Sequence, residues 1–161
     1  MALRGELEKF FGRRKGRRVV LVGIGSPIRN DDVVGLRVLE LLEGKTPKEV
    51  LLLSTETVPE SYTGAIRDFS PTHILLLDAA HFNGSPGEGR IITPKSIANV
   101  SVSTHSLPLN IFIDYLKKSI CDNVILLGIQ GVKIDLGEGL TPEVEYGAKA
   151  LAELLNGILN E

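Results

Sequence analysis

The sequence is poor in the residues that build disulfides and thiolate metal sites. Its 161 residues include one cysteine, Cys121, together with one methionine and no tryptophan. A single thiol excludes a disulfide within the chain and a zinc site made of several cysteines, and it is typical of a reducing compartment. We therefore expect a cytoplasmic protein in which Cys121 is a small packed residue.

Charge and hydrophobicity are also too modest to favour nucleic acid or a membrane as a partner. The net charge is -2, and the one basic run, residues 13–18, is typical of a solvated connector. No apolar run reaches the roughly 20 residues that cross a bilayer, and charges interrupt residues 1–12, where a signal peptide would be apolar. We expect a monomer with one domain over residues 1–161, no nucleic acid partner and no membrane insertion.

Short apolar runs predict the strands of a parallel sheet. The runs are nearly continuous rather than alternating, which is typical of strands buried on both faces. Residues 89–92, bounded by glycines and a proline, predict one further short edge strand. The four main runs cover residues 19–24, 50–53, 74–77 and 124–129.

Helical periodicity fills the segments between these runs. Apolar residues recur at helix spacing after Asp32 and after Pro108, and the last helix is expected to begin at Thr141-Pro142 with Thr141 as its N-cap. An N-terminal helix and a short helix over residues 60–67 complete the pattern. The sequence therefore predicts an α/β fold, a three-layer α/β/α sandwich around a mostly parallel, twisted five-stranded sheet with one short edge strand.

The turn from Gly23 to Asp32 has the position of a phosphate loop but the wrong charge. Glycines after a first strand let the backbone approach a phosphate at a helix N-terminus, whereas Asp31 and Asp32 would repel an anion there. Ile28 stands where a third glycine of G-x-G-x-x-G belongs. We expect no nucleotide cofactor and a cation or proton site, with Asn30 as N-cap and Asp31 as a helix-start residue.

Polar side chains lie at the ends of other predicted strands, where open α/β sheets bind ligands. Asp78 ends the third run, and His105 precedes a helix that must start near Pro108. Two carboxylates and one imidazole from separate connections, Asp32, Asp78 and His105, can form a cation site with open positions. His81 is an alternative ligand, since spacing in the chain does not choose between them.

A serine hydrolase and a small-molecule-binding domain are the competing interpretations. Ser26 follows the first strand and could form a triad with Asp78 and His105. Against this, the G-x-S-x-G elbow is missing, and Pro27 lacks the N–H that would follow the nucleophile in an oxyanion hole. The remaining alternative is an α/β domain in which the acids are structural.

The order and spacing of several motifs resemble the maturation endopeptidases of nickel-iron hydrogenases. The resemblance covers residues 18 to 155 and is closest to the branch that processes the large subunit of hydrogenase 3-type, energy-converting enzymes. Ser26 and Val33 depart from the common Asn and Gly of the family pattern. The motifs that carry it are Gly23-Ile24-Gly25 through Asp31-Asp32, Pro59-Glu60, Ile74-Leu75-Leu76-Leu77-Asp78-Ala79, Pro86-Gly87-Glu88, Thr104-His105-Ser106-Leu107-Pro108-Leu109 and Leu127-Gly128-Ile129-Gln130.

The resemblance implies both an activity and a set of site residues. It implies removal of a C-terminal extension from the large-subunit precursor after nickel insertion, with Asp32, Asp78 and His105 as nickel ligands and the nickel supplied by the substrate. We expect Asp32 or Asp78 to serve as general base, and Glu56 and Gln130 to contact substrate. The alternative is a nickel-dependent binding module that checks the large subunit without cutting it.

Overall fold

The computed structural model describes residues 2–97, 101–102 and 108–161. Four strands are parallel: β1 (Val19–Ile24), β2 (Val50–Glu56), β3 (His73–His81) and β6 (Asn123–Gln130). The edge strand β4 (Gly89–Ile92) is antiparallel to β6, and the path through the sheet is β2-β1-β3-β6-β4. A two-residue strand, β5 (Ser101–Val102), pairs with the end of β3. The predicted mostly parallel sheet with a short edge strand is confirmed.

Strand β3 extends beyond the apolar run that predicts it. The run ends at Leu77, whereas pairing with β6 continues from Asp78 opposite Gly128 to Ala80 opposite Gln130. Backbone hydrogen bonds of a parallel ladder do not require apolar side chains, so the ladder includes the acid that the sequence places at its end. Asp78 is consequently a residue of a central strand rather than of a loop.

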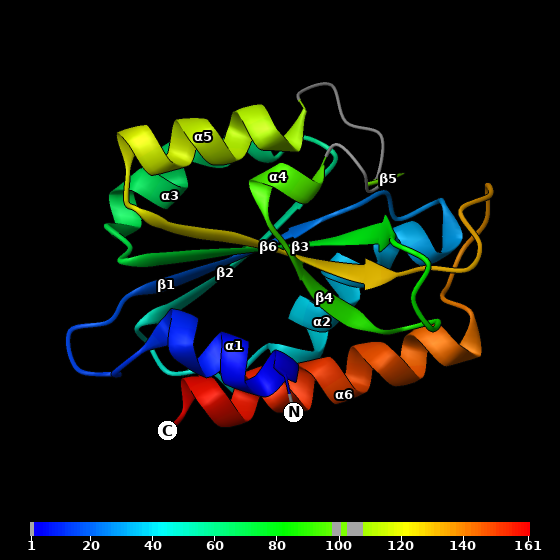
Figure 1. Ribbon diagram of the computed structural model, residues 1–161, viewed down its shortest axis with the longest axis horizontal. Coiled ribbons are helices and arrows are strands. Elements are labelled where there is room, and N and C mark those ends of the chain that lie inside the picture. Colours follow the sequence, from blue (N-terminus) through cyan, green and yellow to red (C-terminus); the bar gives the residue numbers. More distant parts are fainter. Residues whose placement is uncertain (1, 98–100, 103–107) are drawn as a thin grey trace.

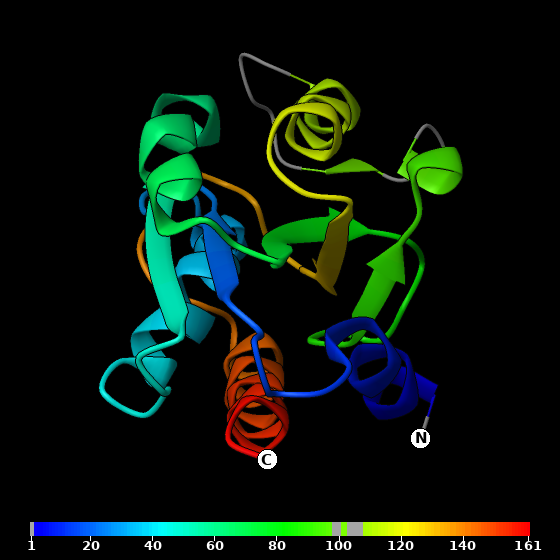
Figure 2. The ribbon, with the colours of Figure 1, turned by 90° about the vertical axis from the view of Figure 1, so that its left-hand side faces the viewer.

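Helices cover both faces of the sheet, as Figures 1 and 2 show. One layer contains α1 (Ala2–Phe11), α2 (Val34–Leu42) and α6 (Pro142–Leu159), and the other contains α3 (Thr63–Phe69), α4 (Pro94–Ile97) and α5 (Leu109–Ser119). Two 3₁₀ turns, η1 (Asn30–Val33) and η2 (Pro59–Tyr62), lead into α2 and α3. The three-layer sandwich predicted from the sequence is therefore the observed architecture.

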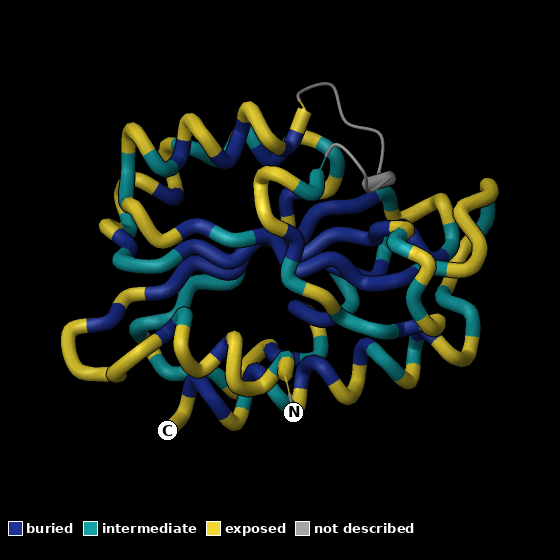
Figure 3. Tube along the Cα trace, viewed as in Figure 1, coloured by how far each residue is buried: buried dark blue, intermediate teal, exposed yellow. Residues whose placement is uncertain are grey.

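Alternate residues of the strands feed two separate hydrophobic cores, one on each face of the sheet. Figure 3 shows the buried strands between the two helical layers. In β3, Leu75 and Leu77 pack with α1, α2 and α6, while Ile74 and Leu76 pack with α3 and α5. Each such buried side chain contributes about 2 kcal/mol relative to exposure. Because side chains alternate along a strand, Asp78 has the parity of the α3 and α5 face. The helix α5 covers this same face, and the predicted ligand His105 comes shortly before α5 in the chain.

Most of the basic run before β1 is exposed, as its composition predicts for a solvated connector, but Arg17 is an exception. Arg17 is only 6% exposed, and its guanidinium donates to the carbonyls of Gly12 and Leu159, both at 3.2 Å. Burial, and next the repulsion of Arg14, lower the Arg17 pKa from its ordinary value. Arg18 donates from Nε to the Phe69 carbonyl at 2.8 Å. These two arginines fasten the start of β1 to the ends of α3 and α6.

Candidate active site at the carboxyl edge of the sheet

The chain doubles back after β1 and places Asp32 over the end of that strand. A side chain at Gly25, whose φ is +149°, would collide with the Asp32 carbonyl, so glycine is required for the approach. The Ser26 backbone N–H donates to Oδ2 of Asp32 at 2.8 Å, which fixes the carboxylate at the turn. The Asp32 side chain lies within the protein, because the residue is 3% exposed. The first motif thus positions a buried acid.

Asp78 lies on the neighbouring strand, and Gly35 allows η1 to approach it. β1 and β3 are adjacent, with Gly23 opposite Leu77, and η1 lies against β3. A Cβ at Gly35 would collide with the Leu77 carbonyl and lie 2.8 Å from the Ile24 carbonyl, so α2 begins in close contact with both strands. Asp78, the next residue of β3, is fully buried. Two buried carboxylates therefore lie toward the carboxyl edge of neighbouring strands, Asp32 in η1 after β1 and Asp78 within β3, and both have interactions within the protein.

The third predicted ligand, His105, lies outside the described residues. The described residues that precede it, Ser101 and Val102, lie at the same edge, since Val102 pairs with Ala80, two residues after Asp78. Over residues 2–97, 101–102 and 108–161, no three His, Cys, Asp or Glu side chains gather as a metal site. The ligand trio accordingly stays a prediction.

Gln130 is buried at the end of β6, and its side-chain amide bonds to the end of β3 and the loop that follows it. Its Oε1 accepts from the backbone N–H groups of Phe82 (2.9 Å) and Gly84 (3.1 Å). Its Nε2 donates to the Gly131 carbonyl and lies 2.9 Å from Nδ1 of His81, the alternative ligand. Gln130 is 3% exposed, and these contacts hold the connection after β3 in place. Its role in substrate contact stays a prediction.

Glu56 ends β2 in a backbone conformation that is uncommon for its type. Its φ is +52°, it is exposed, and the register of β1 against β2 shifts where Ile24 pairs with it. Its carbonyl accepts from the Gly25 N–H at 2.9 Å, while buried Thr55 donates to the Gly23 carbonyl at 3.0 Å. That Glu56 contacts substrate stays a prediction.

Asp31 has a role that sequence reasoning missed. It is fully buried, and its carboxylate accepts from the backbone N–H groups of Val132 (2.8 Å), Lys133 (2.9 Å) and Thr141 (2.8 Å). The Thr141 hydroxyl adds bonds of 3.2 and 3.1 Å to its two oxygens. Asp31 does lie in the first turn of η1, as expected of a helix-start residue. Its carboxylate, however, bonds to the start of α6 and holds residues 131–141 against η1.

Asn30 and Thr141 are also used differently from the sequence prediction. Asn30 has a φ of +45° and donates from Nδ2 to the carbonyls of Glu138 and Gly139, both at 3.3 Å, so it is not an N-cap. Thr141 does occupy the N-cap position of α6, before Pro142, but makes no side-chain cap bond. Its hydroxyl is bound to Asp31 instead. Both residues thus join the 131–141 loop to the turn that carries Asp32.

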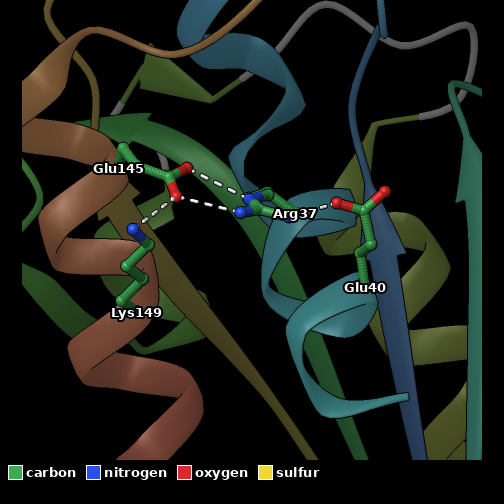
Figure 4. A network of polar contacts seen from close by, with 4 residues as sticks. All are labelled: Arg37, Glu40, Glu145 and Lys149. Atoms are coloured by element: carbon green, nitrogen blue, oxygen red, sulfur yellow. Dashed lines mark hydrogen bonds and ion pairs between the residues drawn. The ribbon is translucent and has the colours of Figure 1, made fainter.

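An ion-pair network joins α2 to α6 beneath this loop (Figure 4). Arg37 donates to both carboxylate oxygens of Glu145, at 3.1 and 3.0 Å, and also contacts Glu40, while Lys149 lies 3.5 Å from Glu145. The hydrogen bond from Arg37 lowers the Glu145 pKa below its ordinary value, and the same bond raises the Arg37 pKa. The network joins α2 to α6 near the beginnings of the two helices.

The fold and these side chains define an α/β protein with a buried carboxylate site at the carboxyl edge of a parallel sheet. Residues 36–161 match the family model described as HycI, hydrogenase maturation protease. The chain belongs to this hydrogenase maturation protease family, and it is a hydrolase. Asp32 lies four positions before the matched range, while Asp78, Gln130 and His105 lie within it.

Relatives from archaea and bacteria are similar over most of their lengths. A Methanocaldococcus jannaschii protein, provisionally named a hydrogenase maturation protease, is 37% identical over 153 residues, 90% of each chain. The hydrogenase 3 maturation protease of Escherichia coli K12 is 32% identical over 139 residues, 86% of this chain and 88% of the relative. The crystal structure of the nickel-iron hydrogenase maturation protease HycI from Thermococcus kodakarensis KOD1 superposes with a TM-score of 0.84 and 37% identity, covering 97% and 99% of the two chains.

None of the helices in the described ranges is long and apolar enough to cross a bilayer.

Proposed function

We propose that this protein is an endopeptidase that removes the C-terminal extension of a hydrogenase large-subunit precursor after nickel has been inserted. The observation that supports the proposal is the pair of buried carboxylates, Asp32 after β1 and Asp78 within the adjacent strand β3, in a chain of the hydrogenase maturation protease family. The cytoplasmic setting indicated by the single cysteine is part of the same proposal.

The nickel in this proposal belongs to the substrate. Carboxylate oxygens and an imidazole are donors suited to nickel, and three such ligands leave positions for groups of the precursor. Asp32 and Asp78 supply the oxygens, and His105 follows β5, which pairs with the end of β3 near Asp78. We propose that these three side chains recognise a precursor that already carries its metal.

The hydrolysis needs a general base, which one of the two aspartates supplies. A carboxylate takes a proton from water, the water oxygen attacks the scissile carbonyl carbon, and the C–N bond breaks as the leaving amine gains a proton. Burial of Asp32 and Asp78 keeps the reacting groups away from bulk water. The Ser26 N–H that donates to Asp32 orients that carboxylate at the edge of the sheet.

The test is to incubate the purified protein with the full-length large-subunit precursor, loaded with nickel or free of it, and to determine the intact masses. Loss of a C-terminal peptide from the loaded precursor alone supports the proposal. A nickel-dependent complex without any loss of mass would instead identify a non-cleaving checkpoint module. Equal cleavage of both precursors would contradict recognition of the metal.

A further inference from the structure

Four exposed aliphatic residues lie on two loops that touch each other, and the first of these loops leads into the turn that carries Asp32. Ile28 is 55% exposed, Val132 58%, Ile134 38% and Leu136 82%, and we call these four residues the apolar ridge. The loops touch, because the Gly137 N–H donates to the Ile28 carbonyl at 2.8 Å and Arg29 donates to the Ile134 carbonyl at 3.2 Å. Figure 1 shows the second loop beyond the carboxyl ends of the strands, between β6 and α6.

Hydrogen bonds to Asp31 and Asn30 fix the backbone of the loop that carries three residues of the apolar ridge. The Asp31 carboxylate accepts from Val132 and Lys133 at one end of the loop and from Thr141 at the other. Between the two ends of the loop, the Asn30 N–H donates to the Gly137 carbonyl at 3.0 Å. A clustered apolar surface that the chain fixes in advance is typical of an interaction site, because a preorganised loop loses little entropy on binding.

A hollow lies beside Pro27, the residue that precedes Ile28 of the apolar ridge. Pro27, Val33, Leu36 and Leu140 line a cavity of about 360 Å³, with Arg37 and Glu145 also at its wall. Pro27 precedes Ile28 of the ridge, and Val33 follows Asp32 of the candidate site. An apolar side chain could enter this hollow while its neighbours cover the ridge, which is the anchor-and-pocket arrangement of protein interfaces.

The charges around the apolar ridge favour a protein as its occupant. Two basic residues, Arg29 and Lys133, are matched by two acidic ones, Asp135 and Glu138. An anionic lipid surface or a nucleic acid would need an excess of positive charge, whereas an apolar centre with a mixed polar rim is typical of protein interfaces. The chain belongs to a protease family, and Asp31, which holds the ridge, is adjacent to Asp32 of the site.

We propose that the apolar ridge and its hollow bind the precursor protein and thereby present its scissile bond to Asp32 and Asp78. This inference rests on the proposed function, because the occupant is the substrate of that function. The apolar ridge then determines specificity, since it selects the precursor by a surface next to the cut, while the aspartates perform the cleavage.

The test compares the double variant Ile134→Ser/Leu136→Ser with Tyr146→Ser. Tyr146 is 69% exposed on α6, outside the apolar ridge, and serves as the matched control. With nickel-loaded full-length precursor, we expect the double variant to raise KM at least about tenfold, as loss of two apolar contacts predicts, with kcat within about twofold of wild type. The control variant should have the KM and kcat of the wild type. An unchanged KM in the double variant would overturn the proposal.

A binding measurement separates this inference from the proposed function. If the wild-type protein leaves the precursor uncut, the proposed function fails, and calorimetric titration of the same precursor still decides the role of the ridge. Weaker binding by the double variant alone supports the ridge, and equal affinities overturn it. Sedimentation of the wild-type protein is the second control, because a dimer that the double variant dissolves would show that a second copy occupies the ridge, which also overturns the proposal.

Discussion

The buried carboxylate of Asp31 accepts a 2.8 Å hydrogen bond from the backbone N–H of Thr141, 110 positions later in the chain. It therefore connects the turn after β1 to the start of α6. Its sequence neighbour Asp32 accepts from Ser26 within the turn itself. Two consecutive acids with the same charge thus have different roles: Asp31 organises the loop, and Asp32 belongs to the candidate site.

Replacing Asp31 by alanine should destabilise the fold strongly. The change removes the acceptor for three backbone N–H groups, and hydrogen bonds to a charged group contribute about 1.5 to 3 kcal/mol each, without being additive. We expect the free energy of unfolding, measured in urea at pH 7, to fall by about 3 to 5 kcal/mol. A loss below about 1 kcal/mol would show that the loop does not depend on this carboxylate.

Two glycine substitutions test the close approach of α2 to the sheet. Gly35→Ala places a methyl group against the carbonyls of Leu77 and Ile24, and such overpacking costs about 1 to 3 kcal/mol. Gly64→Ala, in α3, meets nothing within 4 Å and should stabilise the protein by about 0.5 to 1 kcal/mol. Thermal unfolding should lower the Tm of the first variant and raise that of the second. Equal Tm values for both variants would contradict the packing described for Gly35.

The pairing of Arg37 with Glu145 should contribute to stability above acidic pH. The Glu145 pKa is lowered, chiefly by the Arg37 hydrogen bond, so this contribution is present above the unfolded value of 4.5 and is lost as pH falls through the folded value. Arg37→Met should reduce the free energy of unfolding at pH 7 by about 1 kcal/mol and have a smaller effect at low pH. An effect of the same size at both pH values would show that packing, rather than charge, explains the loss.

The sequence could predict the sheet and the helical layers because their signals lie within single segments. Continuous apolar runs identified β1 and β6, and helical spacing identified α2 and α6. The edge of the sheet at which Asp32 and Asp78 lie was predictable, because parallel strands end at one edge of a sheet. The same argument carried no information about which side chains would bond to each other.

The predictions that failed depend on contacts between distant parts of the chain. Asn30 was expected to cap a helix, but its amide bonds to the loop near Glu138, and Arg17 was expected in solvent, but it reaches the end of α6. Local composition describes the usual environment of a residue type, whereas these environments arise only after the strands align. His105 lies outside the described residues, so its place beside Asp78 stays a prediction.

The most direct test of the proposed function is the intact mass of the nickel-loaded precursor after incubation with wild type, Asp32→Asn or Asp78→Asn. Both substitutions keep the shape of the side chain and remove its basic carboxylate, and loss of a general base lowers rates by about 10² to 10⁴. Circular dichroism of each variant provides the folding control. We predict that wild type removes the C-terminal peptide and that neither folded variant does so in the same time. Cleavage at the wild-type rate by either variant would contradict the assignment of that aspartate to the active site.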